Sequence, residues 1–157
     1  MGFWNKRIIE PIKALLLQGV SADKLAWSLT AGIVLGVFPA LGTTTVLCAA
    51  ASGLFRLNPV AIQLVNWLVY PLQILLLLPF WQWGDQLFGF PPIELTIEGL
   101  QALVSQDWRS AVARLWWTGF RGMVVWVVVS APTAIILQRL LQKLLSGLLQ
   151  NSGKERV

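Results

Sequence analysis

Residues Leu25–Gly84 read LAWSLTAGIVLGVFPALGTTTVLCAAASGLFRLNPVAIQLVNWLVYPLQILLLLPFWQWG, and Arg56 is the only charged residue among these sixty positions. Helices and strands of a soluble protein must show water a polar face, whereas long uncharged apolar runs are typical of segments inside a bilayer. The stretch therefore predicts an all-α integral membrane protein, with the lipid bilayer as its first partner. Prolines, glycines, threonines and amides interrupt the run, so plain spanning helices are not expected.

The composition of the whole chain points the same way. Its 157 residues leave room for one domain, and 12% of them are charged, against about 25% in an ordinary globular protein. Nine tryptophans against one tyrosine suit a membrane protein, in which indole rings populate the headgroup level. The net charge of +5 comes from small clusters near the termini and not from one basic stripe, so we expect no nucleic-acid partner.

This sequence contains few side chains suited to catalysis or to metal binding. It has no histidine, and Cys48 is the only cysteine, so neither an intrachain disulfide nor a cysteine metal cluster can form. We find no paired intramembrane carboxylates, no nucleophile–base set and no phosphate-loop motif. We therefore expect a protein that is not an enzyme and that holds no metal and no cofactor.

The first part of the apolar run, residues 25–55, is broken at Pro39 and Gly42. The uncharged halves on either side of Pro39 have 14 and 16 residues, whereas a spanning helix needs about 20. Proline followed three residues later by glycine favours a turn, and proline disfavours helix in the residue before it. We expect a broken helical hairpin that re-enters the membrane and returns; one long, kinked helix is the alternative.

The rest of the chain divides by charge and by turn signals. The predicted segments are an amphipathic interfacial helix at 1–20, the broken hairpin at 25–55, a transmembrane segment at 57–84 kinked at Pro71, an extracytoplasmic loop at 85–114, a transmembrane helix at 115–137 and an amphipathic interfacial tail at 138–157. Lysine and arginine accumulate on the cytoplasmic side, so both termini are expected there. Charge alone leaves four full crossings as an alternative to the hairpin.

The triplet Thr43, Thr44 and Thr45 follows the first break and is the first candidate binding site. A broken helix inside a membrane leaves backbone groups unpaired, which is tolerated only where protein or a water-filled cavity surrounds them. A helix that starts after Gly42 aims its free N–H groups at the break, and helix N-termini favour anions and phosphates. The alternative is that the threonines cap the helix and bond back to preceding carbonyls.

Side-chain amides form the second candidate set, which consists of Asn58, Gln63, Asn66 and Gln73. Gln63 and Asn66 are three residues apart and share one helical face. Amides in a bilayer are costly without partners, and they often join helices to one another. We consider two interpretations, a polar pocket between the broken segments and a purely structural contact between helices.

Arg121 lies some seven residues into the last apolar stretch and is the third candidate. An arginine buried in a membrane is a functional candidate by default. The alternative is that its side chain reaches the outer headgroups, as nearby Arg114 suggests.

The order of breaks and polar residues resembles one known family. The run G-x-x-x-G-x-F-P-x-x-G-x-T-T at 32–45, then R-L-N at 56–58, Asn66, Tyr70-Pro71 and Gly84 are similar to the bacterial membrane family catalogued as domain of unknown function 2062. Members of that family often carry an Asn-Pro pair in the second break, where this chain has Tyr70-Pro71. The resemblance implies a bacterial-type inner membrane and a loose link to envelope or lipid-linked sugar metabolism.

Two functions follow as hypotheses. The first is a transporter or flippase-like protein for an anionic lipid or small anion, because transporters place binding sites where helices are broken. A chain this short would need a second copy to close a pathway, so we expect a homo-oligomer. The second is a non-catalytic membrane scaffold or accessory subunit for an envelope-biosynthesis or lipid-linked glycan enzyme.

Overall fold

The computed structural model describes residues 21–93 and 107–154, and this part of the chain is all helical. The predicted interfacial helix at 1–20 lies outside these residues. The helices, in chain order, are α2 (Ala22–Gly36), α3 (Thr44–Leu54), α4 (Pro59–Leu68), α5 (Tyr70–Leu87) and α7 (Trp108–Lys154).

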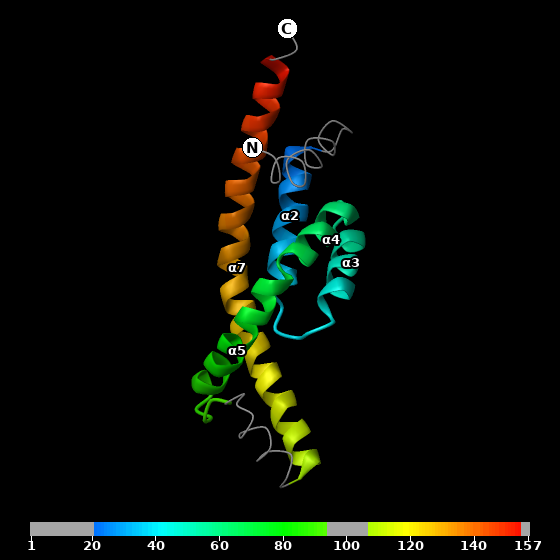
Figure 1. The fold of residues 1–157 in the computed structure, drawn as a ribbon. Coiled ribbons are helices and arrows are strands. Elements are labelled where there is room, and N and C mark those ends of the chain that lie inside the picture. Colours follow the sequence, from blue (N-terminus) through cyan, green and yellow to red (C-terminus); the bar gives the residue numbers. More distant parts are fainter. Residues whose placement is uncertain (1–20, 94–106, 155–157) are drawn as a thin grey trace.

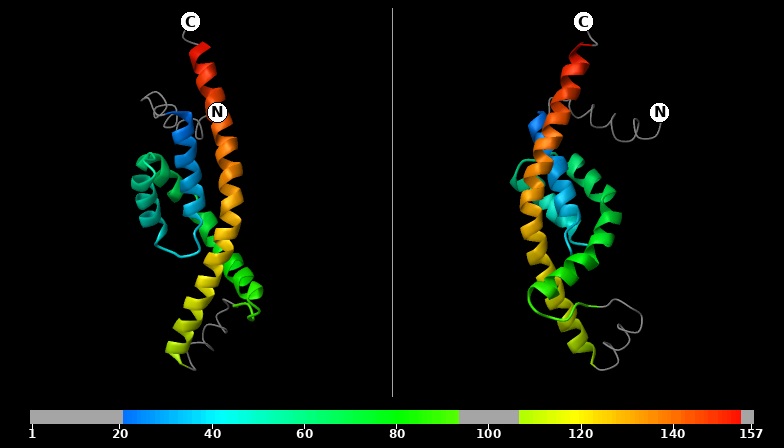
Figure 2. Two further views of the ribbon diagram at one scale, coloured as in Figure 1. Left: turned by 180° about the vertical axis from the view of Figure 1, so that it is seen from behind. Right: turned by 90° about the vertical axis from the view of Figure 1, so that its left-hand side faces the viewer.

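The helices form an elongated bundle along α7 (Figures 1 and 2). Helix α2 runs from one end of the bundle towards its middle, and α3 returns towards that same end. Helices α4 and α5 then lead to the opposite end, from which α7 runs back along the whole molecule. The turn between α2 and α3, which we call the hairpin tip (37–43), therefore lies near the middle of the long axis.

Local sequence signals fix where α2 and α4 begin. The Ser21 hydroxyl accepts a hydrogen bond from the Lys24 N–H at 3.3 Å, and Asp23 occupies the first turn, where the helix dipole favours an acid. The Asn58 side chain accepts from Ala61 N–H at 2.9 Å, and Pro59 follows at the first helical position. Both caps agree with the sequence pattern.

The two ends of α3 depend on left-handed residues. Gly42 has φ +81° in the hairpin tip. At the other end Arg56 has φ +52°, and Leu57 N–H donates to the Ser52 carbonyl at 3.0 Å. This is the hydrogen bond of a Schellman motif, whose left-handed position is usually glycine. Arg56 therefore holds a charge at a strained position between α3 and α4.

At the second break, the one predicted at Pro71, two helices meet at a bend with no loop between them. Helices α4 and α5 meet at Val69 with an angle of 64° between them. Pro71, which the sequence marks as the break, lies in the first turn of α5, where its missing N–H needs no partner. The prediction that this segment is kinked at Pro71 thus corresponds to a bend two residues earlier.

Helix α7 is longer than the predicted transmembrane segment at 115–137. It is a continuous helix of 47 residues, so that segment and the tail from residue 138 belong to one helix that ends at Lys154. The connection expected at 85–114 is shorter at both ends, because α5 runs on to Leu87 and α7 starts at Trp108. The Asp107 side chain explains the early start: it accepts from the N–H groups of Arg109 and Ser110 at 3.1 and 3.3 Å.

Glycines set the closest helix contacts. A Cβ atom on Gly32 of α2 would lie 2.7 Å from the Ile62 carbonyl oxygen of α4, and one on Gly84 of α5 would lie 2.6 Å from backbone atoms of Arg121 and Gly122 in α7. Real Cβ atoms do not approach other atoms so closely. The α2–α4 and α5–α7 contacts therefore depend on the missing side chains.

The exposed surface of the bundle is strongly apolar. The buried cluster where α2, α4 and α7 meet is small and consists of Leu25, Ala26, Leu29, Ala61 and Leu145. Large residues such as Trp67, Leu75 and Trp116 are instead between 65% and 74% exposed. One helix, within Trp108–Gly147, is long and apolar enough to cross a membrane, and the bent pair α4–α5 passes the same test when taken as one span.

Replacing Gly84 with alanine tests the α5–α7 contact. The added methyl group meets the backbone of α7, and such overpacking costs about 1–3 kcal/mol. We expect Gly84→Ala to lower the thermal unfolding midpoint of the protein in detergent. Gly119→Ala is the matched control on α7, because a Cβ there has open space and alanine favours helix. Equal midpoints for the two variants would contradict this account of the contact.

The start of α7 should depend on pH. A hydrogen bond from the Ser110 hydroxyl, and then one from the Arg109 N–H, hold the pKa of Asp107 below its usual range. The carboxylate thus stabilises the first turn at pH values above the unfolded pKa of about 3.9, and this stabilisation is lost as the pH falls through the lower folded pKa. We expect the amide resonances of Arg109 and Ser110 to titrate together below pH 3.9 in NMR spectra. Their titration should disappear in Asp107→Asn, and a midpoint above 3.9 would refute the assignment.

Candidate functional site

The hairpin tip (37–43) is held by a buried amide. Gln73 of α5 is 1% exposed, and its Nε2 donates to the carbonyl oxygens of Phe38 at 2.8 Å and Ala40 at 3.4 Å. The Thr43 hydroxyl also donates to the Ala40 carbonyl, at 2.9 Å. Backbone carbonyls that leave the helix ladder at the tip therefore find side-chain donors, as an apolar environment requires.

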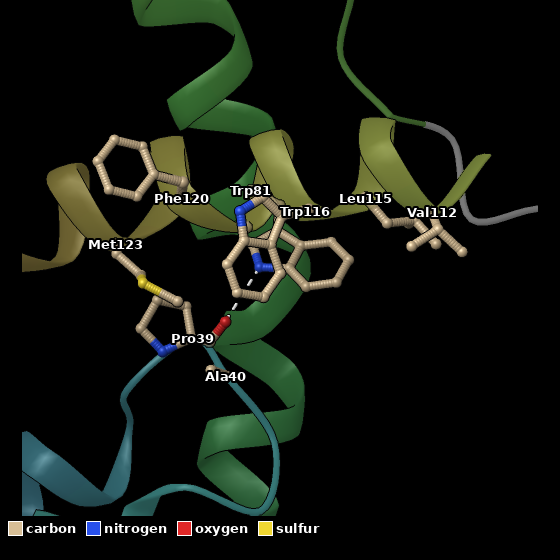
Figure 3. A pocket seen from close by; sticks show the side chains of 9 residues that line it. Pro39, Ala40, Trp81, Val112, Leu115, Trp116, Phe120 and Met123 are labelled. Carbon is tan, nitrogen blue, oxygen red and sulfur yellow. Dashed lines mark hydrogen bonds between the residues drawn. The ribbon is translucent and has the colours of Figure 1, made fainter. Parts of the chain in front are cut away.

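Two tryptophans complete this arrangement. The Trp81 indole N–H donates to the Pro39 carbonyl at 3.1 Å (Figure 3), and the Trp126 indole N–H donates to the Val34 carbonyl near the end of α2 at 3.2 Å. The Trp126 ring also packs edge-to-face on Phe38, with ring centroids 4.9 Å apart. The sequence predicted tryptophans only at the headgroup level, so this role of Trp81 was missed.

Three of the predicted polar residues form one network across α3 and α4. Gln63 Nε2 donates to the Thr45 carbonyl at 3.0 Å, and Asn66 Nδ2 approaches the Thr45 hydroxyl at 3.4 Å and Gln63 Oε1 at 3.3 Å. Asn66 is 3% exposed. Neither Asn66 Oδ1 nor Gln73 Oε1 meets a hydrogen-bond partner in the described chain. The network thus joins the two helices and leaves buried acceptor oxygens beside the tip.

The start of α3 has unused donors. Thr43 turns its hydroxyl back to Ala40 and makes no side-chain cap on α3, while Thr44 is buried and Thr45 belongs to the amide network. Within the described residues no backbone carbonyl accepts from the N–H groups of 44–46. The prediction that the threonines bond back to preceding carbonyls applies to Thr43 alone.

Asn58 lies away from the tip. It caps α4, and its backbone N–H donates to the Ser28 hydroxyl of α2 at 2.9 Å. Its place is the opposite end of the α2–α3 hairpin. The structure therefore does not bring this candidate together with Asn66 and Gln73.

Arg121 also belongs to a separate cluster, beside the α5–α7 crossing. Its Nη1 lies 2.6 Å from Asp85 Oδ1, and the Thr118 hydroxyl lies 3.2 Å from both oxygens of the same carboxylate. The guanidinium sits 3.9 Å from the centroid of the Phe90 ring. Asp85 is 1% exposed, whereas the sequence placed it in an outer loop, so its role as the partner of Arg121 was missed.

An apolar groove of about 470 Å³ opens beside the tip (Figure 3). Pro39 and Ala40 of the tip and Trp81 of α5 form one wall. Residues of α7 form the other wall, and these are Val112, Leu115, Trp116, Gly119, Phe120 and Met123. The groove and the buried Gln73 amide meet at the tip, because Ala40 lines the groove and accepts from Gln73.

The chemistry of the tip is that of binding. It offers free N–H donors at the start of α3, unpartnered amide oxygens and an adjoining apolar wall. No group of three or more His, Cys, Asp or Glu side chains suited to a metal ion occurs in the residues that the structure describes. The tip and its groove are therefore the candidate site, and Asp85–Arg121 is a structural tie next to it.

Neutralising one partner of the Asp85–Arg121 pair should destabilise the protein. Removing one charge of a buried pair leaves the other uncompensated, at a cost of about 3–5 kcal/mol. We expect Asp85→Asn alone to lower the unfolding midpoint strongly, and the double variant Asp85→Asn/Arg121→Gln to recover part of the loss. A double variant as unstable as the sum of the two single variants would show that the two side chains act independently.

Comparison with known proteins gives one match. The profile of a bacterial family described as "Uncharacterized protein conserved in bacteria", domain of unknown function 2062, matches residues 6–148. No curated protein and no solved structure matches the chain. The matched segment is most of the 157-residue chain and contains the tip, the amide network and the ion pair. The chain is therefore a member of this bacterial family, as its glycine, Phe-Pro and threonine motif indicated.

Proposed function

We propose that the protein is a flippase-like membrane transporter that binds the anionic headgroup of a lipid at the hairpin tip. One observation carries this proposal. The buried amide oxygens of Asn66 and Gln73, which have no partners, and the free N–H groups of α3 lie beside a single turn near the middle of a molecule whose surface is largely apolar. Buried polar groups that lack partners are expensive, so a site that keeps them is expected to receive a ligand.

The proposal places the bundle in a membrane with a re-entrant hairpin. Helices α2 and α3 have 15 and 11 residues, or about 22 and 16 Å of rise, less than the roughly 30 Å of a hydrocarbon core. The hairpin thus enters and leaves on one side, and its tip stops inside the bilayer. Of the helices that the structure describes, only α7 and the bent pair α4–α5 then cross.

The positions of basic residues support a cytoplasmic location for that side. Lys24 lies in the first turn of α2, and Arg56 follows α3. Arg139 and Lys143 lie on the part of α7 that packs against the start of α2, where Gln138 Nε2 donates to Asp23 at 3.1 Å. Lysine and arginine accumulate on cytoplasmic surfaces, which supports cytoplasmic termini in a bacterial inner membrane.

The chemistry of the tip fits a lipid headgroup better than a free ion. The N–H groups at the start of α3 and the helix dipole favour a phosphate. The acceptor oxygens of Asn66 and Gln73 suit hydroxyl groups of the same headgroup. The groove lined by Trp81, Trp116 and Phe120 offers an apolar wall for an acyl chain. A second copy of the chain would close the open side of this pathway.

A negative charge at Thr43 tests the proposal. The helix dipole at the start of α3 favours a negative charge, which offsets part of the cost of burying a carboxylate. Thr43→Asp should repel an anionic headgroup, and because Thr43→Asp loses the hydroxyl bonded to the Ala40 carbonyl, its thermal midpoint is measured beside the wild type. Repulsion of about 1.4 kcal/mol reduces transfer roughly tenfold, and Thr43→Asn is the matched uncharged control.

The measurement is transbilayer movement of a fluorescent anionic phospholipid in liposomes that contain the purified protein. We expect transfer by the wild type and by Thr43→Asn, and about tenfold slower transfer by Thr43→Asp. Entry of a small anion into the same liposomes, without lipid transfer, would indicate that the tip binds a small anion and not a lipid headgroup. The flippase proposal fails if no transfer occurs, or if all three proteins are equally fast. The scaffold hypothesis then remains.

A further inference from the structure

A second groove lies on another side of the α2–α3 hairpin, away from Pro39 and Trp81. Its volume is about 520 Å³, within the range of roughly 300–1,000 Å³ that ligand sites occupy. Its walls come from α2, the end of α3 and α7. The apolar lining consists of Trp27, Ala31, Val34, Leu35, Ala51, Phe55, Leu57 and Ala134.

One end of this second groove carries two opposite charges. Asp23 and Lys24 are adjacent in the first turn of α2, and both line the groove. Asp23 Oδ1 accepts from Gln138 Nε2 at 3.1 Å, which fixes the carboxylate against α7 and leaves Oδ2 available to a ligand. No salt bridge within the described residues involves Lys24. A groove end that offers both a carboxylate and an ammonium group suits a ligand that carries both an ammonium and a phosphate.

A hydroxyl group lies deeper in the same second groove. Thr30 lines the groove and is 1% exposed, and its Oγ1 has no hydrogen-bond partner in the described chain. Thr30 is six residues beyond Lys24, or about 9 Å along the axis of α2. Threonine in a helix has two allowed χ1 rotamers, so rotation can present the hydroxyl to the groove. At that depth it would meet the ester carbonyls of a lipid, below the phosphate.

We propose that the second groove binds a zwitterionic glycerophospholipid with a primary ammonium headgroup, of the phosphatidylethanolamine class. Lys24 pairs with the phosphate, Asp23 accepts from the ammonium, and the Thr30 hydroxyl donates to an ester carbonyl. The acyl chain lies along the apolar walls. An anionic phospholipid is disfavoured, because Asp23 would face its phosphate without an ammonium between them. This inference shares with the proposed function only the position in a membrane, because the tip and its residues take no part.

Lipid binding to the full-length protein tests the inference. Delipidated protein in detergent is titrated with phosphatidylethanolamine or phosphatidylglycerol, and bound lipid is counted by native mass spectrometry. We expect the wild type to bind phosphatidylethanolamine about tenfold more tightly, the effect of about 1.4 kcal/mol. Asp23→Asn, which keeps an acceptor for Gln138, should remove or reverse that preference. Thr30→Val, which keeps the shape of the side chain, should weaken binding of both lipids several-fold.

Lys143→Gln is the control for a change of net charge away from the groove, since Lys143 is exposed on α7 and does not line the groove. It should leave the lipid preference unchanged. Equal binding of the two lipids, or a preference that survives Asp23→Asn, overturns the proposal. Binding that appears only after residues 1–20 are removed also overturns it, because that segment would then be the occupant. The outcome of the lipid-transfer assay with the Thr43 variants does not change this lipid-binding result, so the two proposals can fail independently.

Discussion

Backbone carbonyls at the hairpin tip must be satisfied inside the protein, and the rest of the structure is arranged around this constraint. The chain turns between α2 and α3 among apolar side chains, where an unpaired carbonyl is costly. Gln73 and Trp81 of α5 and Trp126 of α7 supply donors to this region. The position of α5 and α7 against the hairpin is therefore set by hydrogen bonds as well as by packing.

Donors and acceptors at the tip are not equally satisfied. The carbonyls of Phe38, Pro39 and Ala40 all accept hydrogen bonds, whereas the first N–H groups of α3 have no backbone acceptor in the described chain. The amide oxygens of Asn66 and Gln73 are likewise left over after their nitrogens have bonded. This imbalance distinguishes the tip from the Asp85–Arg121 cluster, in which a carboxylate meets three donor contacts.

Much of the fold could be predicted from single residues. Pro39 and Gly42 correctly marked the first break, and Pro71 marked the bend to within two residues, because these signals act within one helical turn. Long-range partners were not predictable. Nothing in the local sequence says that Asp85 reaches Arg121, or that Trp81 serves Pro39, since both contacts depend on how α5 crosses the chain 36 and 42 residues away. Arg121 was recognised as an unusual charge in an apolar stretch, but its partner could be identified only from the crossing of α5 and α7 in the structure.

The crossing at Gly84 and Gly122 has a mechanical consequence. Gly84 lets the backbones of α5 and α7 touch, and the Trp81 side chain of α5 lies against Gly122 of α7. Trp81 is hydrogen-bonded to the tip and lies three residues before Gly84 on α5, and Asp85, which pairs with Arg121, follows Gly84 directly. A change in the angle between α5 and α7 would therefore act on both bonds together. The tip and the ion pair are linked within about one turn of α5, with no relay of side chains between them.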